Sequence, residues 1–117
     1  MNPGNPEFWL FMDRLIEECP IEIDRPKGSS HPRYPQMIYP INYGFLRGST
    51  TVDGGGLDCW RGSGDAAELV GLILTVDLIK KDAELKLLLG CTEDDIQIIL
   101  NFLNKNSMRA VHLRRSG

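Results

Sequence analysis

Four aspartates occur in two pairs whose spacing could bring carboxylates together. Asp53 and Asp58 flank the glycines at 54–56, where a tight turn would place the two acids near one another. Asp77 and Asp82 lie at either end of a four-residue segment between two expected strands. Carboxylates at neighbouring strand ends could bind Mg²⁺, a hard ion that prefers oxygen ligands. Two such ions can clamp a phosphoryl group and activate a bridging water.

A second set of side chains could donate hydrogen bonds to phosphate oxygens: Lys27, Arg33, Tyr39, Tyr43, Lys80 and Lys86. Each of these features alone also has an ordinary structural interpretation. An Asp-Gly pair is a common hairpin turn, and strand tyrosines are often half-buried aromatics of a sheet. Catalysis is therefore indicated only by the order and spacing of all of them together.

Helices are predicted near both ends of the chain. Asn5-Pro6-Glu7 is typical of a helix start, and Pro20 must end a helix that runs to about Cys19. Its apolar stripe is widened by residues 9–11, so the helix is expected to pack on the core, or in addition to contribute to a dimer contact. Thr92 and Asp95 approximate a capping box and predict a second helix with an apolar face.

Between the helices the sequence predicts short strands at 21–23, 43–46, 57–61, 69–79 and 85–89, with a last strand at 108–113. Residues 25–40 contain four prolines and are predicted to be a long loop. We therefore expect one mainly β (α+β) domain over 1–117. Its helix at 1–20 precedes a small β-barrel, a second helix and a final strand at 21–117.

Composition excludes several classes of protein. The chain has 117 residues with 13 Lys+Arg against 16 Asp+Glu, which argues against a nucleic-acid binder. Its apolar runs are too short to span a membrane, and no basic region precedes the first of them, so a cytoplasmic protein is expected. Cys19, Cys59 and Cys91 have neither disulfide nor zinc spacing and are expected to be core residues.

The residues 39–45, Y-P-I-N-Y-G-F, resemble the Y-P-x-N-Y-G-[FY] segment of the soluble family I inorganic pyrophosphatases. Glu22-Ile23 followed by P-K-G-S at 26–29 is similar to the E-I-P…K-G-S stretch of that family. D-G-G-G-L-D at 53–58 falls where the family has D-G-D-P-x-D. Asp77 and Asp82 have the spacing of its later metal acids. The resemblance covers about residues 22–83.

This resemblance implies an OB-like closed five-stranded β-barrel that hydrolyses pyrophosphate, or a related small phosphoanhydride, with Mg²⁺. It implies metal binding by Asp53, Asp58, Asp77 and Asp82. The catalytic candidates are Asp58, Glu22 and Tyr43, and the candidates for substrate binding are Lys27, Arg33, Tyr39, Tyr43 and Lys86.

Two of several departures from the family pattern bear most directly on the site and keep alternatives open. Gly55 stands where the family has the acid that orients the attacking water, and Glu84 stands where it has a lysine. The hypotheses are a Mg²⁺-dependent hydrolase, a phosphate- or metal-binding module that has lost its chemistry, and an interaction protein. The expected partners are a small phosphorylated compound and a second copy in a homo-oligomer, with neither nucleic acid nor membrane.

Overall fold

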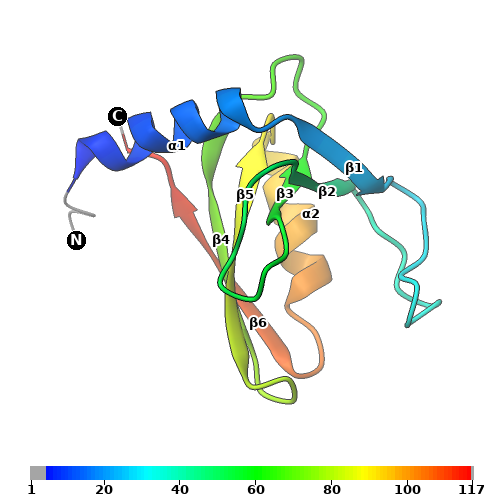
Figure 1. Ribbon diagram of the computed structural model, residues 1–117. Coiled ribbons are helices and arrows are strands. Elements are labelled where there is room, and N and C mark those ends of the chain that lie inside the picture. Colours follow the sequence, from blue (N-terminus) through cyan, green and yellow to red (C-terminus); the bar gives the residue numbers. More distant parts are fainter. Residues whose placement is uncertain (1–4, 117) are drawn as a thin grey trace.

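The computed structural model describes residues 5–116, which form two helices and six strands (Figure 1). In chain order these are α1 (Pro6–Glu18), β1 (Ile21–Arg25), β2 (Asn42–Leu46), β3 (Leu57–Arg61), β4 (Leu69–Asp77), β5 (Asp82–Leu89), α2 (Glu93–Leu103) and β6 (Met108–Arg114). Every predicted helix and strand is therefore present. The boundaries of β4 and β5 differ from the prediction, because residues 78–81 form the turn between them.

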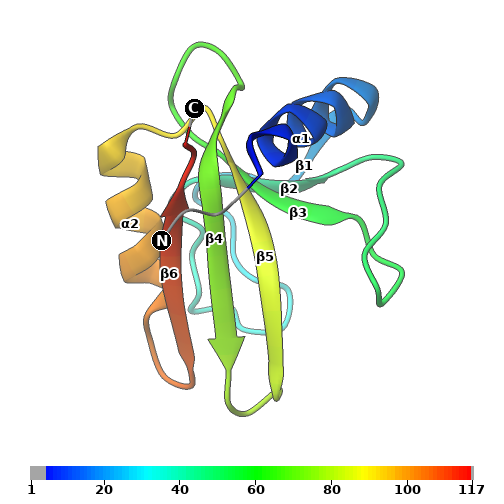
Figure 2. The same ribbon diagram turned by 90° about the vertical axis from the view of Figure 1, so that its left-hand side faces the viewer.

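The strands form one open sheet in the order β1-β2-β3-β5-β4-β6. The β3–β5 pair is parallel and all the others are antiparallel. Figure 2 shows that β1, β2 and β3 run across the direction of β4, β5 and β6, so the sheet is strongly twisted. The expected closed five-stranded barrel is not formed. The described sheet has six strands, and β6 pairs along β4 rather than returning to β1.

Helix α1 covers one face of the sheet. The Asn5 side chain accepts a hydrogen bond from the Glu7 backbone N–H at 2.9 Å and so caps the helix. The wide apolar stripe buries Trp9 among Leu46, Leu72 and other strand residues. Arg115, beyond β6, holds the helix through two hydrogen bonds to the Asp13 carboxylate at 2.7 and 2.8 Å.

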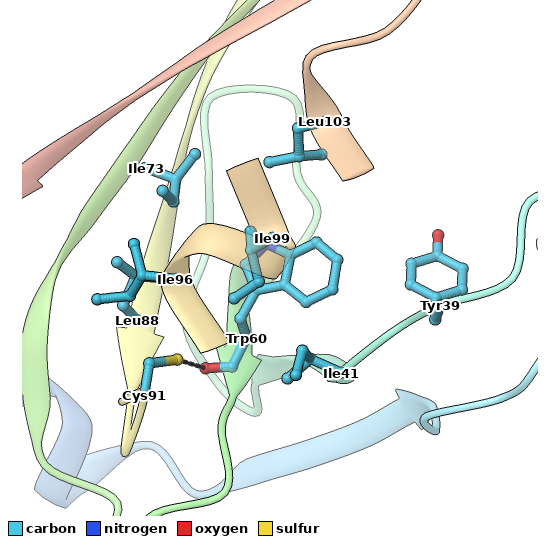
Figure 3. Packing of buried hydrophobic residues seen from close by; sticks show 9 residues of the cluster. All are labelled: Tyr39, Ile41, Trp60, Ile73, Leu88, Cys91, Ile96, Ile99 and Leu103. Atoms are coloured by element: carbon cyan, nitrogen blue, oxygen red, sulfur yellow. Dashed lines mark hydrogen bonds between the residues drawn. The ribbon is translucent and has the colours of Figure 1, made fainter. Parts of the chain in front are cut away.

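Helix α2 covers the other face of the sheet. Trp60 and Ile99 are central members of the cluster of buried hydrophobic residues that lies between α2 and the strands (Figure 3). The predicted capping box is confirmed: Thr92 Oγ1 accepts from the Asp95 N–H, and Asp95 Oδ2 accepts from the Thr92 N–H. The three cysteines are buried and free, as predicted from their spacing.

The proline-rich segment 26–41 is a long loop, as predicted. It folds back on itself through backbone hydrogen bonds between 28–31 and 37–39 and an isolated bridge from Ser30 to Ile38. Within residues 5–116, neither helix is long and apolar enough to cross a membrane.

Candidate functional site

A cleft of about 730 Å³ lies where the parallel strands β3 and β5 separate. Their backbones pair only from Cys59 and Leu87 onward, so the two strand starts diverge. The turn that precedes β3 closes one side of this opening. The carboxylates that line the cleft are Asp53, Asp58, Asp82 and Glu84. Acids far apart in the sequence thus meet because β3 and β5 run in the same direction.

The turn before β3 holds Asp53 in a fixed conformation. The Thr51 hydroxyl donates to the Asp53 carboxylate, and the Gly55 N–H donates to Asp53 Oδ1 at 3.3 Å. The Thr51 N–H closes the turn on the Gly55 carbonyl at 2.7 Å. The hydrogen bond from Thr51, followed by that from Gly55, lowers the pKa of Asp53. Asp53 is exposed and is a carboxylate at neutral pH.

Alternation along β5 directs Asp82, Glu84 and Lys86 to one face of the sheet. Lys86 is only 6% exposed, and its ammonium group contacts three oxygens. The Nζ atom lies 2.8 Å from the Tyr43 hydroxyl, 3.2 Å from Glu84 Oε2 and 3.4 Å from Asp58 Oδ2. The two carboxylates thus border the cleft and also contact a buried positive charge.

Tyr43 links this charged group to the aromatic core. Its ring packs on Trp60 at 4.7 Å between centroids and lies near Tyr39 at 5.4 Å. Burial, with the neighbouring negative charge of Asp58, strongly raises the pKa of the Tyr43 phenol. The phenol therefore stays protonated at neutral pH.

Asp77 and Asp82 are direct partners across β4 and β5, but their carboxylates have different roles. Asp77 is buried, and its Oδ1 accepts hydrogen bonds from the Ile79 and Lys80 N–H groups and from Ser107 Oγ. The hydrogen bonds from Lys80 and Ser107 lower the pKa of Asp77. Asp77 stabilises the β4–β5 turn, whereas Asp82 lines the cleft and pairs with Lys80 at 3.7 Å.

Other predicted site residues lie outside the lining of this cleft. Glu22, on β1, pairs with Arg47 at 3.0 Å. The Tyr39 ring is buried, and its hydroxyl accepts from Arg25 at 2.8 Å. Lys27 and Arg33 are exposed on the loop 26–41. Of the eight distinct predicted site residues beyond Lys86 and Tyr43, the structure brings three into the cleft: Asp53, Asp58 and Asp82.

The carboxylate oxygens of the cleft can bind Mg²⁺ when water and substrate oxygens complete its coordination. Among residues 5–116, no three His, Cys, Asp or Glu side chains are placed to enclose an ion. Mg²⁺ is, however, commonly bound by one or two carboxylates together with waters and substrate phosphates. The cleft carboxylates supply hard oxygen ligands of that kind. The site therefore fits an ion that is shared with a phosphate compound, and not a cage built from protein alone.

Sequence reasoning noted Glu84 only as a departure from the family pattern and did not assign it to the site. The signal that could have found it is the period of two along β5, which puts positions 82, 84 and 86 on one face. Thr51, which holds Asp53, carried no such signal. Comparisons with protein-family models and with curated proteins find no significant match to this chain.

Proposed function

We propose that the cleft between the 51–56 turn and the start of β5 hydrolyses a small phosphoanhydride, with inorganic pyrophosphate as the expected substrate. One observation carries this proposal. Four carboxylates from the turn, β3 and β5 line one cleft of about 730 Å³, which is large enough for two phosphate groups and their waters. In the reaction a water adds to one phosphorus atom, the bridging P–O bond breaks, and two phosphates leave.

Charge argues that the substrate binds as its magnesium complex. Free pyrophosphate would be repelled by four carboxylates, of which Lys80 and Lys86 neutralise only part. Mg²⁺ would supply charge neutralisation and polarise the phosphoryl oxygens when it is bound. Asp53, Asp82 and Glu84 would hold its hydration shell, and Asp58 would accept a hydrogen bond from the attacking water.

A binding module without turnover is the second candidate. Gly55 provides no carboxylate in the turn, and Asp58 is already engaged by the Lys86 ammonium group. Positioned acid–base catalysis contributes about 10²–10⁴-fold to a rate, so its loss would leave slow hydrolysis or none. This candidate predicts affinity for magnesium pyrophosphate without phosphate release.

The test is release of phosphate from pyrophosphate with and without Mg²⁺, measured for the wild type, Asp58→Asn and a control. Asp94→Asn on α2 is the control, because Asp94 is an exposed acid outside the cleft. Hydrolysis predicts magnesium-dependent release that Asp58→Asn abolishes and Asp94→Asn preserves. A silent wild type that still binds magnesium pyrophosphate by calorimetry would instead establish the binding module. Neither release nor binding would reject both.

A further inference from the structure

The Lys86 ammonium group lies between two cleft acids. It contacts Glu84 Oε2 at 3.2 Å and Asp58 Oδ2 at 3.4 Å, and it lies 5.2 Å from the centroid of the Tyr43 ring. The Asp58 and Glu84 side chains are about one third exposed, whereas that of Lys86 is 8% exposed. The cation therefore reaches the two carboxylates from the interior of the protein, and the carboxylates border the cleft on their other side.

The fold fixes the position of this ammonium group. Lys86 lies on β5, directly opposite the fully buried Ile73 of β4. A buried charge is stable only when it is paired, and the carboxylates of Asp58 and Glu84 are the acidic partners of Lys86. Without this ammonium group, two like charges would face each other across the start of the parallel pair.

We propose that Lys86 is a built-in counter-ion that occupies the position between Asp58 and Glu84 where a divalent cation would otherwise bind. The free protein then binds divalent cations weakly, because the ammonium group already occupies the position between these two carboxylates and neutralises part of their charge. The inference concerns metal binding without any phosphate compound, so it goes beyond the proposed hydrolysis and can fail or succeed separately from it.

The experiment is a titration of the full chain with Mn²⁺ alone, followed by electron paramagnetic resonance of the free ion. Mn²⁺ is a hard-ligand probe for the same oxygen donors as Mg²⁺. Lys86→Met keeps the apolar stem and removes the charge. We expect this variant to bind Mn²⁺ at least about tenfold more tightly than the wild type, because two charges a few ångströms apart interact by more than that factor.

Two further variants test whether the higher affinity for Mn²⁺ depends on Asp58 and Glu84. Lys86→Met combined with Glu84→Gln removes one carboxylate and should return the affinity to that of the wild type. Lys105→Met removes an exposed lysine elsewhere and should leave the affinity unchanged. The proposal is overturned if folded Lys86→Met binds Mn²⁺ no more tightly than the wild type, or if the Glu84→Gln double variant keeps the gain.

Lys86→Gln is the second variant in case Lys86→Met does not fold, because its amide can still form a hydrogen bond with the Tyr43 hydroxyl.

A measurement on the wild type tests the proposal without any substitution. Nitrogen-15 resonances of the lysine ammonium groups should show Lys86 unaffected by Mg²⁺ at concentrations that fill exposed carboxylate sites. A Lys86 resonance that shifts with Mg²⁺ at sub-millimolar concentration would show that the ion displaces it, and would overturn the proposal.

Discussion

Gly55 leaves room in the cleft for a larger side chain. A Cβ atom at this position would lie 3.7 Å from Asp53 Oδ1 and 3.9 Å from Thr51 Oγ1, which are ordinary van der Waals distances. The turn itself is held by Thr51 and Asp53 and by the Gly55 backbone. A carboxylate can therefore be introduced beside the proposed substrate without rebuilding the turn.

We predict that Gly55→Asp raises magnesium-dependent phosphate release by about 10²-fold or more, because the added carboxylate can orient or deprotonate the water. Gly55→Asn is the matched control, with the same shape and no charge, and it should give no comparable increase. Phosphate release at saturating Mg²⁺ measures both. Equal rates in the two variants would show that the carboxylate at this position does no chemistry.

Gly44, unlike Gly55, has no room for a larger side chain. A Cβ atom on this residue of β2 would lie 1.9 Å from the Glu22 carbonyl oxygen of β1. Because that neighbour is backbone, the two strands would have to move apart.

We predict that Gly44→Ala lowers the free energy of unfolding by about 3 kcal/mol or more through this clash. Gly55→Ala is the control and should change it by less than about 0.5 kcal/mol, because that Cβ atom meets no close contact. Urea denaturation of both variants measures the difference. An unchanged midpoint for Gly44→Ala would mean that β1 and β2 are not packed this closely.

Among the elements, the start of α2 depends on one buried carboxylate. Asp95 Oδ2 accepts from the Thr92 N–H at 2.9 Å and from the Ser63 N–H and hydroxyl at 2.8 and 2.9 Å. It therefore ties α2 to the segment that follows β3. Burial would raise the pKa of Asp95, but the hydrogen bonds from Ser63 and Thr92 outweigh it and the pKa is lowered.

A lowered folded-state pKa means that this carboxylate stabilises the protein above its unfolded pKa of about 3.9. The stabilisation is lost as the pH falls through the lower folded-state value. We predict that Asp95→Asn costs about 1–3 kcal/mol at pH 7, and that its difference from the wild type shrinks below about pH 4. Urea denaturation between pH 2 and pH 7 measures it. A difference that grows at acid pH would contradict the assignment.

On the scale of the whole molecule, one face of the sheet is only partly covered. Helix α1 buries Leu72 of β4, but further along the same face Leu74, Val76 and Val111 are 39%, 45% and 62% exposed. Strand alternation and the β4–β6 register place these three side chains together. On α1, Leu10 and Phe11 are also largely exposed.

Charge favours a second copy of the chain as the partner of this face. Helix α1 has four acidic residues and one basic residue, whereas Arg109 lies on the same face of β6 as Val111; Arg114 and Arg115 already pair with Glu93 and Asp13 of their own chain. The helix of one copy can thus lie on the β4–β6 face of another, with apolar side chains inside and opposite charges around them. This is the self-association that the width of the helix stripe had suggested.

We predict a dimer at micromolar concentration that Val111→Asp converts to monomer, because a carboxylate would be buried between apolar side chains. Leu78→Asp is the control, since Leu78 is also largely exposed but lies on the β4–β5 turn. Sedimentation velocity measures the association of each. A monomeric wild type would contradict the prediction. A Val111→Asp variant that remains dimeric would show that the interface lies elsewhere.

The sequence by itself determined the helices and strands, because their signals are local. Asn5 and Pro20 bound α1, the capping box of Thr92 and Asp95 begins α2, and alternation or apolar runs mark each strand. The acids Asp53, Asp58 and Asp82 could also be selected from their order in the chain. The inferences about helices and strands each depend on residues a few positions apart.

Only the tertiary structure decided which of these residues meet. The parallel pairing of β3 with β5 brings Lys86 to Asp58, 28 positions away, while the turn hydrogen bonds of Asp77 direct that carboxylate to Ser107. The sheet stays open because β6 pairs with β4, a choice that spacing within the chain does not encode. Strand order and register depend on burying apolar side chains against both helices at once, which is a property of the whole chain.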